Sequence, residues 1–524
     1  MGKEIGIDFG TTTTEVSYVD DNGKIKSLKL DSGSYIIPTV LYFKSKEEWI
    51  IGKSAQNKGA LDPSACVRNF KLFLTDPEQR FDVKAENGEE FVIKPIKAAQ
   101  LFINSLIQKI QTELLKAVPD DGTIDKAVIT VPAQFDPEEK AAVKDAISRA
   151  ATAAGFSEIK VAAEPTAAAI AYQNENSAEK ETILVYDFGG GTFDVSVIKK
   201  EGDSYLEIAT DGDKSLGGNR LTEKLAEFIW KRCCKIVGQD YPFEEDEFDE
   251  TCYNITKQDF RKNKFGVFEA AEKIKQDLSE IDCVDNSFVN FYSPDLTQIE
   301  IGEFSIDDFN DIVWDDIEKT VKLTERVFDE TLKKGGISKV DRIILVGGSS
   351  QIPLVSELLS KNSKFKGLIN QLKDSAALIS KGAAKLASAN LKVEEKTRFE
   401  LGTKVTRGVD SYFCKIIDAG ENLPCSGKCT FFKMRPNQTE VTVEYYEKDV
   451  KNYPNAEKIE DDGINLVNKL TISGIPDIPK WSLEVVFNIE SDGTPTVTAG
   501  ILDSSGKVIK TDQIIITKDN GVLY

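Results

Sequence analysis

The sequence contains no histidine among its 524 residues, and this absence narrows the chemistry open to the chain. Ser-His-Asp and Cys-His nucleophile activation are excluded, as are the usual histidine ligands of metal ions. Any catalysis therefore has to rest on carboxylates, lysine and threonine. A metal partner would be a hard cation held by oxygen atoms.

Cysteine is sparse, with eight residues scattered over the chain, and this pattern predicts no disulfide framework. The closest approach to a metal motif is Cys425-x3-Cys429, which lacks two further ligands and is interpreted as two small strand residues. No apolar run approaches a membrane span, and the residues after Met1 lead directly into a strand rather than a signal peptide. We therefore expect a cytoplasmic protein in a reducing compartment, without membrane contact.

The net charge of −21 argues against nucleic-acid binding, which needs basic faces. A hydrophobic content of 40% and a charged content of 29% are typical of an ordinary globular protein. The length predicts roughly three to four domains. We infer no partner from the acidic surface itself.

The most informative stretch is residues 184–198, LVYDFGGGTFDVSVI. Two β-prone runs flank Asp187, three glycines and Thr192, which predicts a hairpin with a glycine-rich turn. Glycine permits positive φ and a close approach of the backbone to a ligand. Turn N–H groups beside carboxylates form an anion-binding nest next to a cation site. Phosphate with a metal ion is the chemistry that this stretch suggests.

Residues 5–19, IGIDFGTTTTEVSYV, repeat this pattern without a gap at an offset of 179 residues, the separation of Asp8 and Asp187. Glu15 falls on Asp194 in the same alignment. One glycine-rich hairpin alone would fit an ordinary turn equally well. Two copies in one chain predict two similar halves, each presenting a phosphate loop to a shared cleft.

Strand and helix patterns alternate to about residue 390, which predicts mixed α/β layers. We expect strands over residues 36–43, 127–131, 159–163, 206–210 and 341–345, and helices over residues 96–116, 138–154, 268–279 and 317–334. A helix of small residues begins at Glu164 and packs closely against a neighbour. The helix over 268–279 would place Glu272, Lys275 and Ser279 on one face. Residues 241–253 are interpreted as an acidic, exposed lobe tip.

The pattern changes after the charged segment LKVEEKTRF, residues 391–399, which we interpret as a linker. From residue 401 onward the chain shows short alternating strands and turns. This predicts an all-β, sandwich-like module.

The motifs GIDFGTTTT, TVPAQF, AAEPTAAAIAY, VYDFGGGTFDVSVI, SLGGN, EAAEKIKQDLS, ILVGGSS and KGAA occur in this order, followed by ENLPCSGKCTFF, QTEVTVEYYE, GIPDIPKWSLEVVFNIESDG and IIITKDNGVL. Over essentially its full length the chain resembles the 70-kilodalton heat-shock chaperones, as an atypical lidless member or a truncated one. The resemblance implies an actin-like, ribonuclease-H-like duplicated α/β ATPase domain of two lobes over residues 1–388. A linker over 389–398 and a β-sandwich peptide-binding domain over 399–524 would follow.

The resemblance also implies a site for ATP or ADP with Mg²⁺, and with K⁺ as an accompanying ion. The metal residues would be Asp8, Asp187 and Asp194, and the catalytic residues Lys71, Glu164, Asp187 and Thr192. The phosphates would be held by Gly10, Thr11, Thr12, Thr13, Gly189, Gly190 and Gly191. The nucleoside pocket would comprise Gly217, Gly218, Glu272, Lys275, Ser279, Gly347, Gly348, Ser349 and Gln351. The peptide groove would comprise Thr406, Phe431, Met434 and Val441.

Several positions depart from the family pattern. Gln351 stands in place of an arginine that stacks on adenine, which should weaken nucleotide affinity. Lys140 and Ala163 replace an arginine and an asparagine that serve ATP signalling and J-domain docking, and Thr406 replaces an apolar arch residue. The segment LKVEEKTR replaces a run of leucines. Coupling between nucleotide and peptide is therefore expected to be altered.

Three functions follow as hypotheses. The first is an ATP-hydrolysing chaperone that holds unfolded or extended peptide, with J-domain proteins and exchange factors as partners. The second is a non-catalytic, ATP-binding co-chaperone or exchange factor that acts on another heat-shock chaperone. The third is an actin-like filament protein or a sugar kinase, against which the β-sandwich argues.

Overall fold

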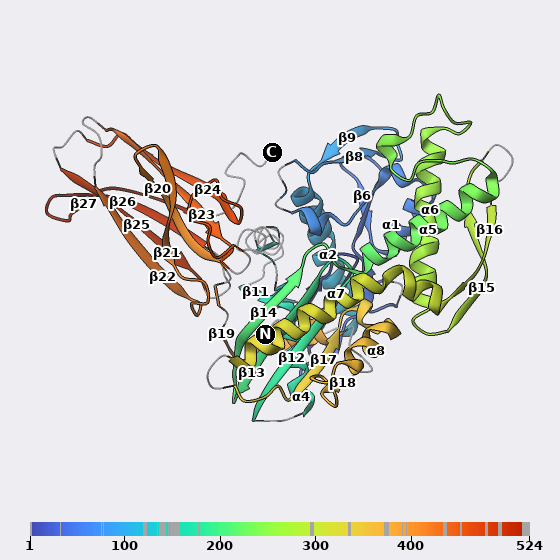
Figure 1. The fold of residues 1–524 in the computed structure, drawn as a ribbon, viewed down its shortest axis with the longest axis horizontal. Coiled ribbons are helices and arrows are strands. Elements are labelled where there is room, and N and C mark those ends of the chain that lie inside the picture. The colour runs from blue at the N-terminus through green and yellow to red at the C-terminus, as the bar shows by residue number, and fades with distance from the viewer. Residues whose placement is uncertain are drawn as a thin grey trace. The chain divides into compact units, whose positions relative to one another are not determined.

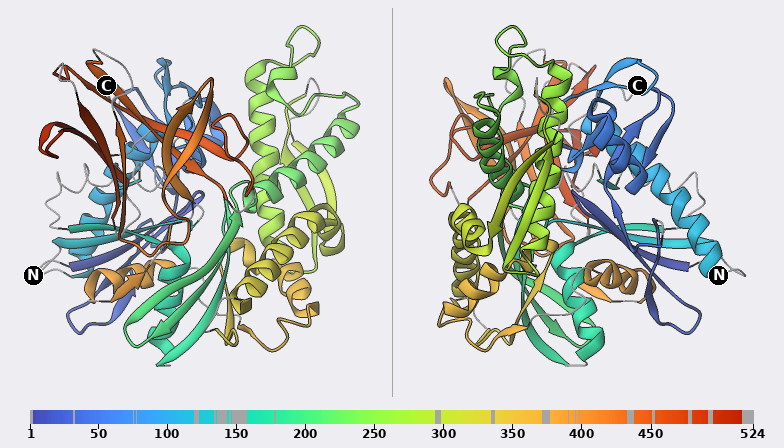
Figure 2. Two further views of the ribbon diagram at one scale, coloured as in Figure 1. Left: turned by 60° about the vertical axis from the view of Figure 1, so that its left-hand side comes forward. Right: turned by 90° about the vertical axis from the view of Figure 1, so that its right-hand side faces the viewer.

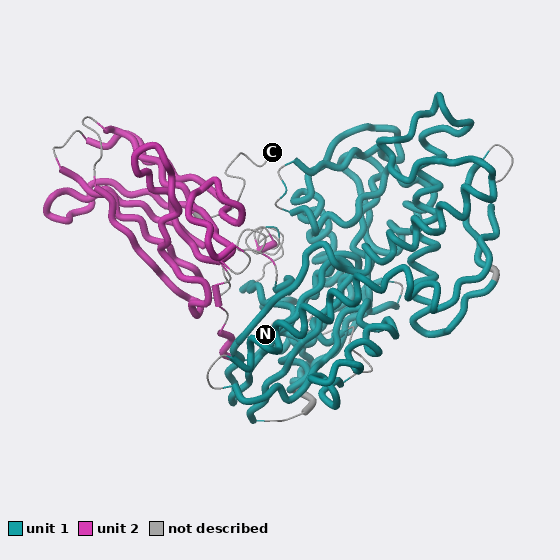
Figure 3. Tube along the Cα trace, viewed as in Figure 1, with its two compact units in different colours: residues 1–134, 146–391 teal, residues 135–145, 392–524 magenta. Residues whose placement is uncertain are grey.

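The computed structural model describes residues 3–31, 33–74, 76, 78–118, 123–133, 135, 143–144, 146, 158–176, 179–293, 298–333, 337–370, 377–389, 391–394, 396–397, 399–432, 438–450, 453–476, 480–490 and 495–515. The chain divides into two compact units (Figure 3). Unit 1 comprises Met1–Gln134 and Ala146–Leu391, and unit 2 comprises Phe135–Asp145 and Lys392–Tyr524. The predicted domain boundaries stay a prediction.

The first sheet of unit 1 is built on the N-terminal hairpin. Its strands are β1 (Lys3–Phe9), β2 (Thr13–Val19), β3 (Ile25–Ser27), β4 (Ile36–Pro38), β10 (Ile124–Val131) and β11 (Glu158–Ala163). The strand order is β11-β10-β1-β2-β3, and β4 also pairs with β2. The strands β1, β10 and β11 run parallel, whereas β2 and β3 are antiparallel to their neighbours.

The second sheet repeats this arrangement. Its strands within unit 1 are β12 (Lys180–Phe188), β13 (Phe193–Glu201), β14 (Ser204–Asp213), β17 (Arg342–Val346) and β18 (Ile369–Asn370), all labelled in Figure 1. The order β18-β17-β12-β13-β14 matches the first sheet strand for strand, with the same parallel and antiparallel pairs. Figure 2 shows both groups of strands, blue to teal for the first and green to gold for the second. The duplication predicted from the two hairpins is confirmed at the level of topology.

Two helices of small residues pack closely in the first half. They are α4 (Glu164–Asn176) and α9 (Leu378–Ser388). A Cβ atom added to Gly382 would lie 1.8 Å from the carbonyl oxygen of Ala167, and one added to Gly6 would lie 2.1 Å from the backbone nitrogen of Ala384. Because both contacts involve backbone atoms, only glycine lets α9 approach α4 and β1 this closely. The close packing predicted for the helix at Glu164 is confirmed.

Longer helices and short strands complete unit 1. The helices are α1 (Lys53–Leu61), α2 (Pro95–Ala117), α5 (Gly218–Val237), α6 (Lys257–Asp277), α7 (Ile306–Lys333) and α8 (Pro353–Lys361). The strands are β5 (Val40–Phe43), β6 (Trp49–Ile51), β7 (Cys66–Arg68), β8 (Phe81–Lys84), β9 (Glu90–Ile93), β15 (Cys283–Asn290) and β16 (Gln298–Ser305). None of the described helices is long and apolar enough to cross a membrane.

Five expectations from the sequence need correction or fall outside the described residues. The helix predicted over 268–279 is the C-terminal part of α6, which begins at Lys257. The strand predicted over 36–43 is two strands, because β4 and β5 belong to different sheets. The helix predicted from residue 317 begins at Ile306. The segment 241–253 is not simply exposed, since Tyr241 and Phe248 are buried in the core around Trp230. The helix predicted over 138–154 lies outside the described residues, apart from positions 143, 144 and 146.

Unit 2 is a sandwich of two antiparallel four-stranded sheets. One has the order β21-β20-β23-β24 and the other β22-β25-β26-β27. The strands are β20 (Glu400–Arg407), β21 (Asp410–Ile417), β22 (Cys425–Phe432), β23 (Glu440–Lys448), β24 (Ile464–Ser473), β25 (Trp481–Ile489), β26 (Pro495–Asp503) and β27 (Val508–Ile515). Residues from both sheets form one buried hydrophobic cluster, which includes Leu401, Val443, Ile472, Val485 and Phe487. The predicted all-β module is confirmed for the described residues.

The segment predicted as a linker is partly structured. It contains the short strand β19 (Lys392–Glu394). The Thr397 hydroxyl donates to the carbonyl oxygen of Asp418 at 2.7 Å and accepts from the backbone N–H of Glu421 at 3.0 Å. The C-terminal part of this segment is therefore anchored to unit 2.

Candidate functional site

The two glycine-rich turns face each other inside unit 1. A Cβ atom added to Gly190 would lie 2.4 Å from the Thr12 hydroxyl oxygen, and one added to Gly191 would lie 2.4 Å from the Thr11 hydroxyl oxygen. Any larger residue in the second turn would therefore displace the first. The absence of side chains at these positions is what brings the turns together.

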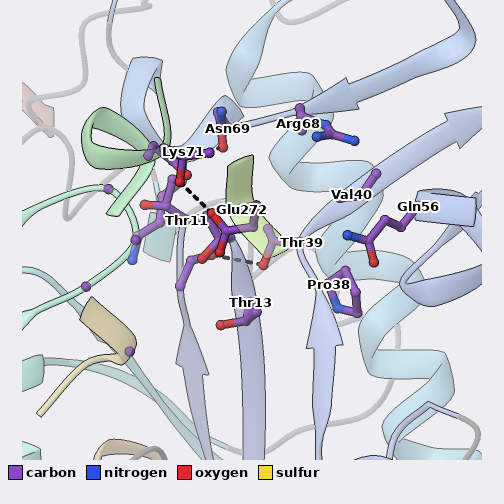
Figure 4. Close-up of a pocket in the computed structure, with 18 of the residues that line it drawn as sticks. Thr11, Thr13, Pro38, Thr39, Val40, Gln56, Arg68, Asn69, Lys71 and Glu272 are labelled. Carbon is purple, nitrogen blue, oxygen red and sulfur yellow. Dashed lines mark hydrogen bonds between the residues drawn. The ribbon is translucent and has the colours of Figure 1, made fainter. Parts of the chain in front are cut away.

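A cavity of about 1130 Å³ opens at this junction and is lined by residues of both halves. Thr11, Asn69 and Lys71 lie together on one side of it (Figure 4). The sequence-predicted residues in its lining are Asp8, Gly10, Thr11, Thr12, Thr13, Lys71, Glu164, Asp187, Gly189, Gly190, Gly191, Thr192, Glu272, Lys275, Ser279, Gly347, Gly348 and Ser349. A pocket with many polar groups converging on one volume is typical of a ligand site.

Lys71 is a buried cation at the floor of the cavity. Its side chain is 1% exposed, and its Nζ donates to a Glu164 carboxylate oxygen at 3.0 Å and to the carbonyl oxygen of Phe9. The 3-10 turn Phe70–Phe73 carries Lys71, and Glu164 is the first residue of α4. A lysine is buried in this way only when it is paired, so the pair fixes the ammonium group beside the turns.

Carboxylates crowd the same floor. Burial raises the pKa of Asp8 well above its usual range, and the charges of Glu164 and Glu15 raise it further. Burial also raises the pKa of Asp187, helped by the charges of Glu164 and then Asp194. One oxygen of Asp187, Oδ2, is buried without a hydrogen-bond partner among the described residues. Buried, mutually repelling carboxylates with an unsatisfied oxygen suit a hard divalent cation such as Mg²⁺.

The second turn is held from behind by backbone contacts. The N–H of Gly218 donates to the carbonyl oxygen of Gly189 at 2.9 Å, and the N–H of Asn219 donates to that of Gly190 at 2.7 Å. The Ser349 hydroxyl also donates to Gly189, at 3.0 Å. These hydrogen bonds satisfy the carbonyl groups of Gly189 and Gly190. They fix the conformation of the turn before any ligand binds.

Further polar groups from α5 and α6 form a network at the cavity wall. Lys275 Nζ donates to Glu272 Oε2 at 2.7 Å and to the Thr222 hydroxyl at 2.8 Å. Burial alone would raise the pKa of Glu272, but the charge of Lys275 and hydrogen bonds from Lys275, Thr222 and Gln276 lower it overall. Because α6 ends at Asp277, Ser279 lies beyond the helix rather than on its face. Its hydroxyl still donates to the Lys275 carbonyl oxygen at 3.0 Å.

A family model described as Hsp70 protein matches residues 4–523, which is nearly the whole chain. The chain belongs to the Hsp70 family. Hsp70-family proteins are chaperones, and in general they are ATPases that bind ATP or ADP with Mg²⁺. The chain is thereby a chaperone of this family.

Four predicted site residues of this Hsp70-family chain stand outside the cavity lining. Asp194 is buried beside Asp187 and acts on it by charge. Gly217 and Gly218 lie directly behind the second turn, where a Cβ atom on Gly217 would meet the Gly191 backbone at 2.4 Å. Gln351 is exposed, and its amide donates to the Ser350 hydroxyl at 3.3 Å.

Sequence reasoning missed several residues of the site. The Asn219 amide donates to the Asn69 side-chain oxygen at 3.1 Å, which links the two halves across the cavity. Thr130 donates to Asp8 at 3.3 Å, and Arg68 pairs with Glu269 at 3.3 Å. Asn219 directly follows the SLGG turn, so its position next to that motif was an available signal. The sequence carries no comparable signal for Asn69 or Arg68.

The three described groove residues, Thr406, Phe431 and Val441, belong to unit 2. Phe431 and Val441 are half-buried against the sandwich core. Thr406 is exposed near the end of β20. Met434 and the motif position Lys140 lie outside the described residues.

Proposed function

We propose that this Hsp70-family chain binds ATP with Mg²⁺ in the unit 1 cavity, hydrolyses it slowly, and holds unfolded or extended peptide with unit 2. J-domain proteins and exchange factors are its proposed partners, K⁺ its accompanying ion, and the cytoplasm its proposed location. The two lobes of the proposed actin-like ATPase domain correspond to the two matching halves of unit 1.

One observation carries this proposal. The buried pair of Lys71 and Glu164 lies with Asp8 and Asp187 in the cavity where the two glycine-rich turns meet. Phosphoryl transfer to water needs a positioned nucleophile and compensation of the phosphate charge, rather than a covalent intermediate. All these requirements can be met without histidine, which the chain lacks.

The residues of the chain divide this work between them. Backbone N–H groups of the two turns, at Thr11, Thr12 and Gly189–Gly191, would hold the phosphates. Lys71 would orient the attacking water, and Glu164 would keep the Lys71 ammonium in place. Asp8, Asp187 and Asp194 would hold Mg²⁺, directly or through water. The cation would supply charge compensation on the phosphates.

The nucleoside would lie against the network of Glu272, Lys275 and Ser279, beside Gly347–Ser349. In unit 2, Phe431 and Val441 would contribute apolar contacts to peptide, together with Met434 and Thr406. An extended peptide can supply side chains to such contacts without folding first.

The deciding experiment compares ATP turnover by the full chain and by Lys71→Ala, with Lys97→Ala as a matched control. Lys97 is an exposed lysine on α2. We expect Lys71→Ala to lower turnover at least ~100-fold while ATP still binds, because a positioning group is lost from the reaction rather than from ground-state binding. Equal turnover by the two variants would defeat the assignment.

The exposed position of Gln351 favours one alternative, an ATP-binding co-chaperone or exchange factor without turnover. A side chain outside the cavity lining contributes nothing to binding of the adenine base. This alternative predicts stable ATP binding by the wild-type chain, no measurable hydrolysis, and an altered ATPase rate of a second Hsp70-family chaperone. Fluorescent-peptide affinity measured with ADP and then with ATP separates the two, since only the first function links peptide affinity to the nucleotide state.

A further inference from the structure

Two cysteines of unit 2 face the interior of the sandwich from opposite sheets. Cys414 of β21 is paired with Thr403 of β20, which is 3% exposed and shares its face with the core residue Leu401. Cys429 of β22 is paired with Val485, a fully buried core residue. Directly opposite residues of an antiparallel pair point to the same face, so both thiols point between the sheets.

The strands that carry these thiols are the adjacent edges of the two sheets. The first sheet begins with β21 and the second with β22. A Cβ atom added to Gly427 would lie 2.4 Å from the carbonyl oxygen of Ile416, so the two edges touch at this point. Cys414 precedes Ile416 by two residues and Cys429 follows Gly427 by two. Each cysteine therefore lies two residues from this point of contact along its own edge strand.

The two thiols are close enough to interact, because burial and then the charge of the neighbouring Cys429 raise the pKa of Cys414. Both are half-buried and free. Cys425, on the same inward row of β22, is also free and provides a comparison. The opposite edge of the sandwich is linked differently, by a hydrogen bond from Lys510 Nζ to the carbonyl oxygen of Ser473.

We propose that Cys414 and Cys429 form a redox site, a dithiol that a low-molecular-weight disulfide such as oxidised glutathione converts into a bond between the two sheets. One cysteine, as its thiolate, attacks a glutathione sulfur and releases one glutathione thiolate. The second cysteine loses its proton to solvent, attacks the protein-bound sulfur and releases the other. Two protein thiols are oxidised to one disulfide, and one glutathione disulfide is reduced to two thiols.

Mass spectrometry of the intact chain tests this site. The reduced protein is incubated with oxidised glutathione, quenched in acid, alkylated with iodoacetamide and digested without reductant. We expect a peptide cross-linked through Cys414 and Cys429, with both residues lost from the alkylated pool. We also expect the urea midpoint of the oxidised chain to rise, since the bond restricts the unfolded chain.

Variants sharpen the result. Cys425→Ser should give the same cross-link. Cys414→Ser should instead leave a lasting glutathione adduct on Cys429, because no partner thiol remains to displace it. The proposal is overturned if Cys414 and Cys429 stay fully alkylated while the exposed Cys252 takes up glutathione, or if Cys429 links to Cys425. The wild-type peptide map decides the matter even if a serine variant fails to fold.

Discussion

The two halves of unit 1 share a strand order. They differ in how closely a helix packs on the sheet and in how many acidic side chains lie near the paired aspartates. In the first half, α9 lies so close to β1 that Gly6 has no room for a side chain. The equivalent residue of the second half, 179 positions later, is Val185, which is fully buried. The shared topology therefore does not imply interchangeable sequences. Each half has its own packing distance between sheet and helix.

The two halves also differ in the acidic residue that lies opposite each aspartate of the glycine-rich hairpins. Glu15 is paired with Asp8 and Asp194 with Asp187. Burial raises the pKa of Glu15 to about 7, and Lys381 partly offsets this. The charges of two carboxylates, Glu164 and Glu15, raise the pKa of Asp8, whereas the charges of three, Glu164, Asp194 and Asp8, raise the pKa of Asp187. The second half therefore has more negative charge close to its paired aspartate. We infer that it contributes more to the affinity for a cation.

The largest effect that would sharpen this comparison is expected from Gly6→Ala. The new Cβ atom would lie 2.1 Å from the Ala384 nitrogen and 2.3 Å from the Ser380 carbonyl oxygen, and backbone atoms cannot rotate away. We expect the free energy of unfolding to fall by about 3 kcal/mol or more. Val185→Ala at the equivalent position should cost about 2 kcal/mol, through lost methyl groups. Urea denaturation of both variants provides the measurement.

Gly500→Ala serves as the control for this prediction. Gly500 is also a strand glycine, and a Cβ atom there would meet nothing within 4 Å. Its substitution should change the free energy of unfolding by less than about 1 kcal/mol. If Gly6→Ala behaved like Gly500→Ala, the close approach of α9 to β1 would be wrong.

The next effect concerns the cation. Asp194→Asn should lower ATP turnover about 10- to 100-fold and raise the Mg²⁺ concentration needed for half-maximal rate, because a charge beside Asp187 is lost. Glu15→Gln, the equivalent change in the first half, should stay within about threefold of wild type. Turnover measured across a Mg²⁺ titration tests both. If both variants lost turnover equally, the two halves would contribute equally to cation binding.

Much of this comparison could be predicted from the sequence, and some of it could not. The repeat of Asp8 and Asp187 in two hairpins predicted two similar halves, because turn chemistry and alternation are local properties. The role of Asn219 against Asn69 could not be predicted, since it depends on how two distant segments meet. The exposed position of Gln351 likewise depends on the path of the chain after β17. Spacing along the sequence does not encode either arrangement.

In unit 2, too, some features could be predicted from the sequence and others could not. Alternating residues predicted short strands from residue 401 onward, and in two of the observed strands Phe431 and Val441 pack against the core. Alternation fixes which face a residue takes within a strand, but not which edge of one sheet meets an edge of another. The approach of Cys414 to Cys429 is of this second kind. The proximity of these two cysteines follows only from the order of the strands in the two sheets.

The smallest effect tests the link between the halves at Asn69. Among the described residues Asn69 is the only non-glycine with positive φ, at 59°, and it directly precedes the turn that carries Lys71. Asn69→Ala loses the hydrogen bond from Asn219 and strains the left-handed backbone, so we expect a loss of about 2 kcal/mol in the free energy of unfolding. Asn69→Gly loses only the hydrogen bond and should cost about 1 kcal/mol, as should Asn219→Ala. Urea denaturation ranks the three variants, and turnover should fall most in Asn69→Ala because Lys71 is then displaced. If glycine at position 69 were as harmful as alanine, backbone conformation would not be what holds Lys71, and the hydrogen bond between the halves would have to carry the whole effect.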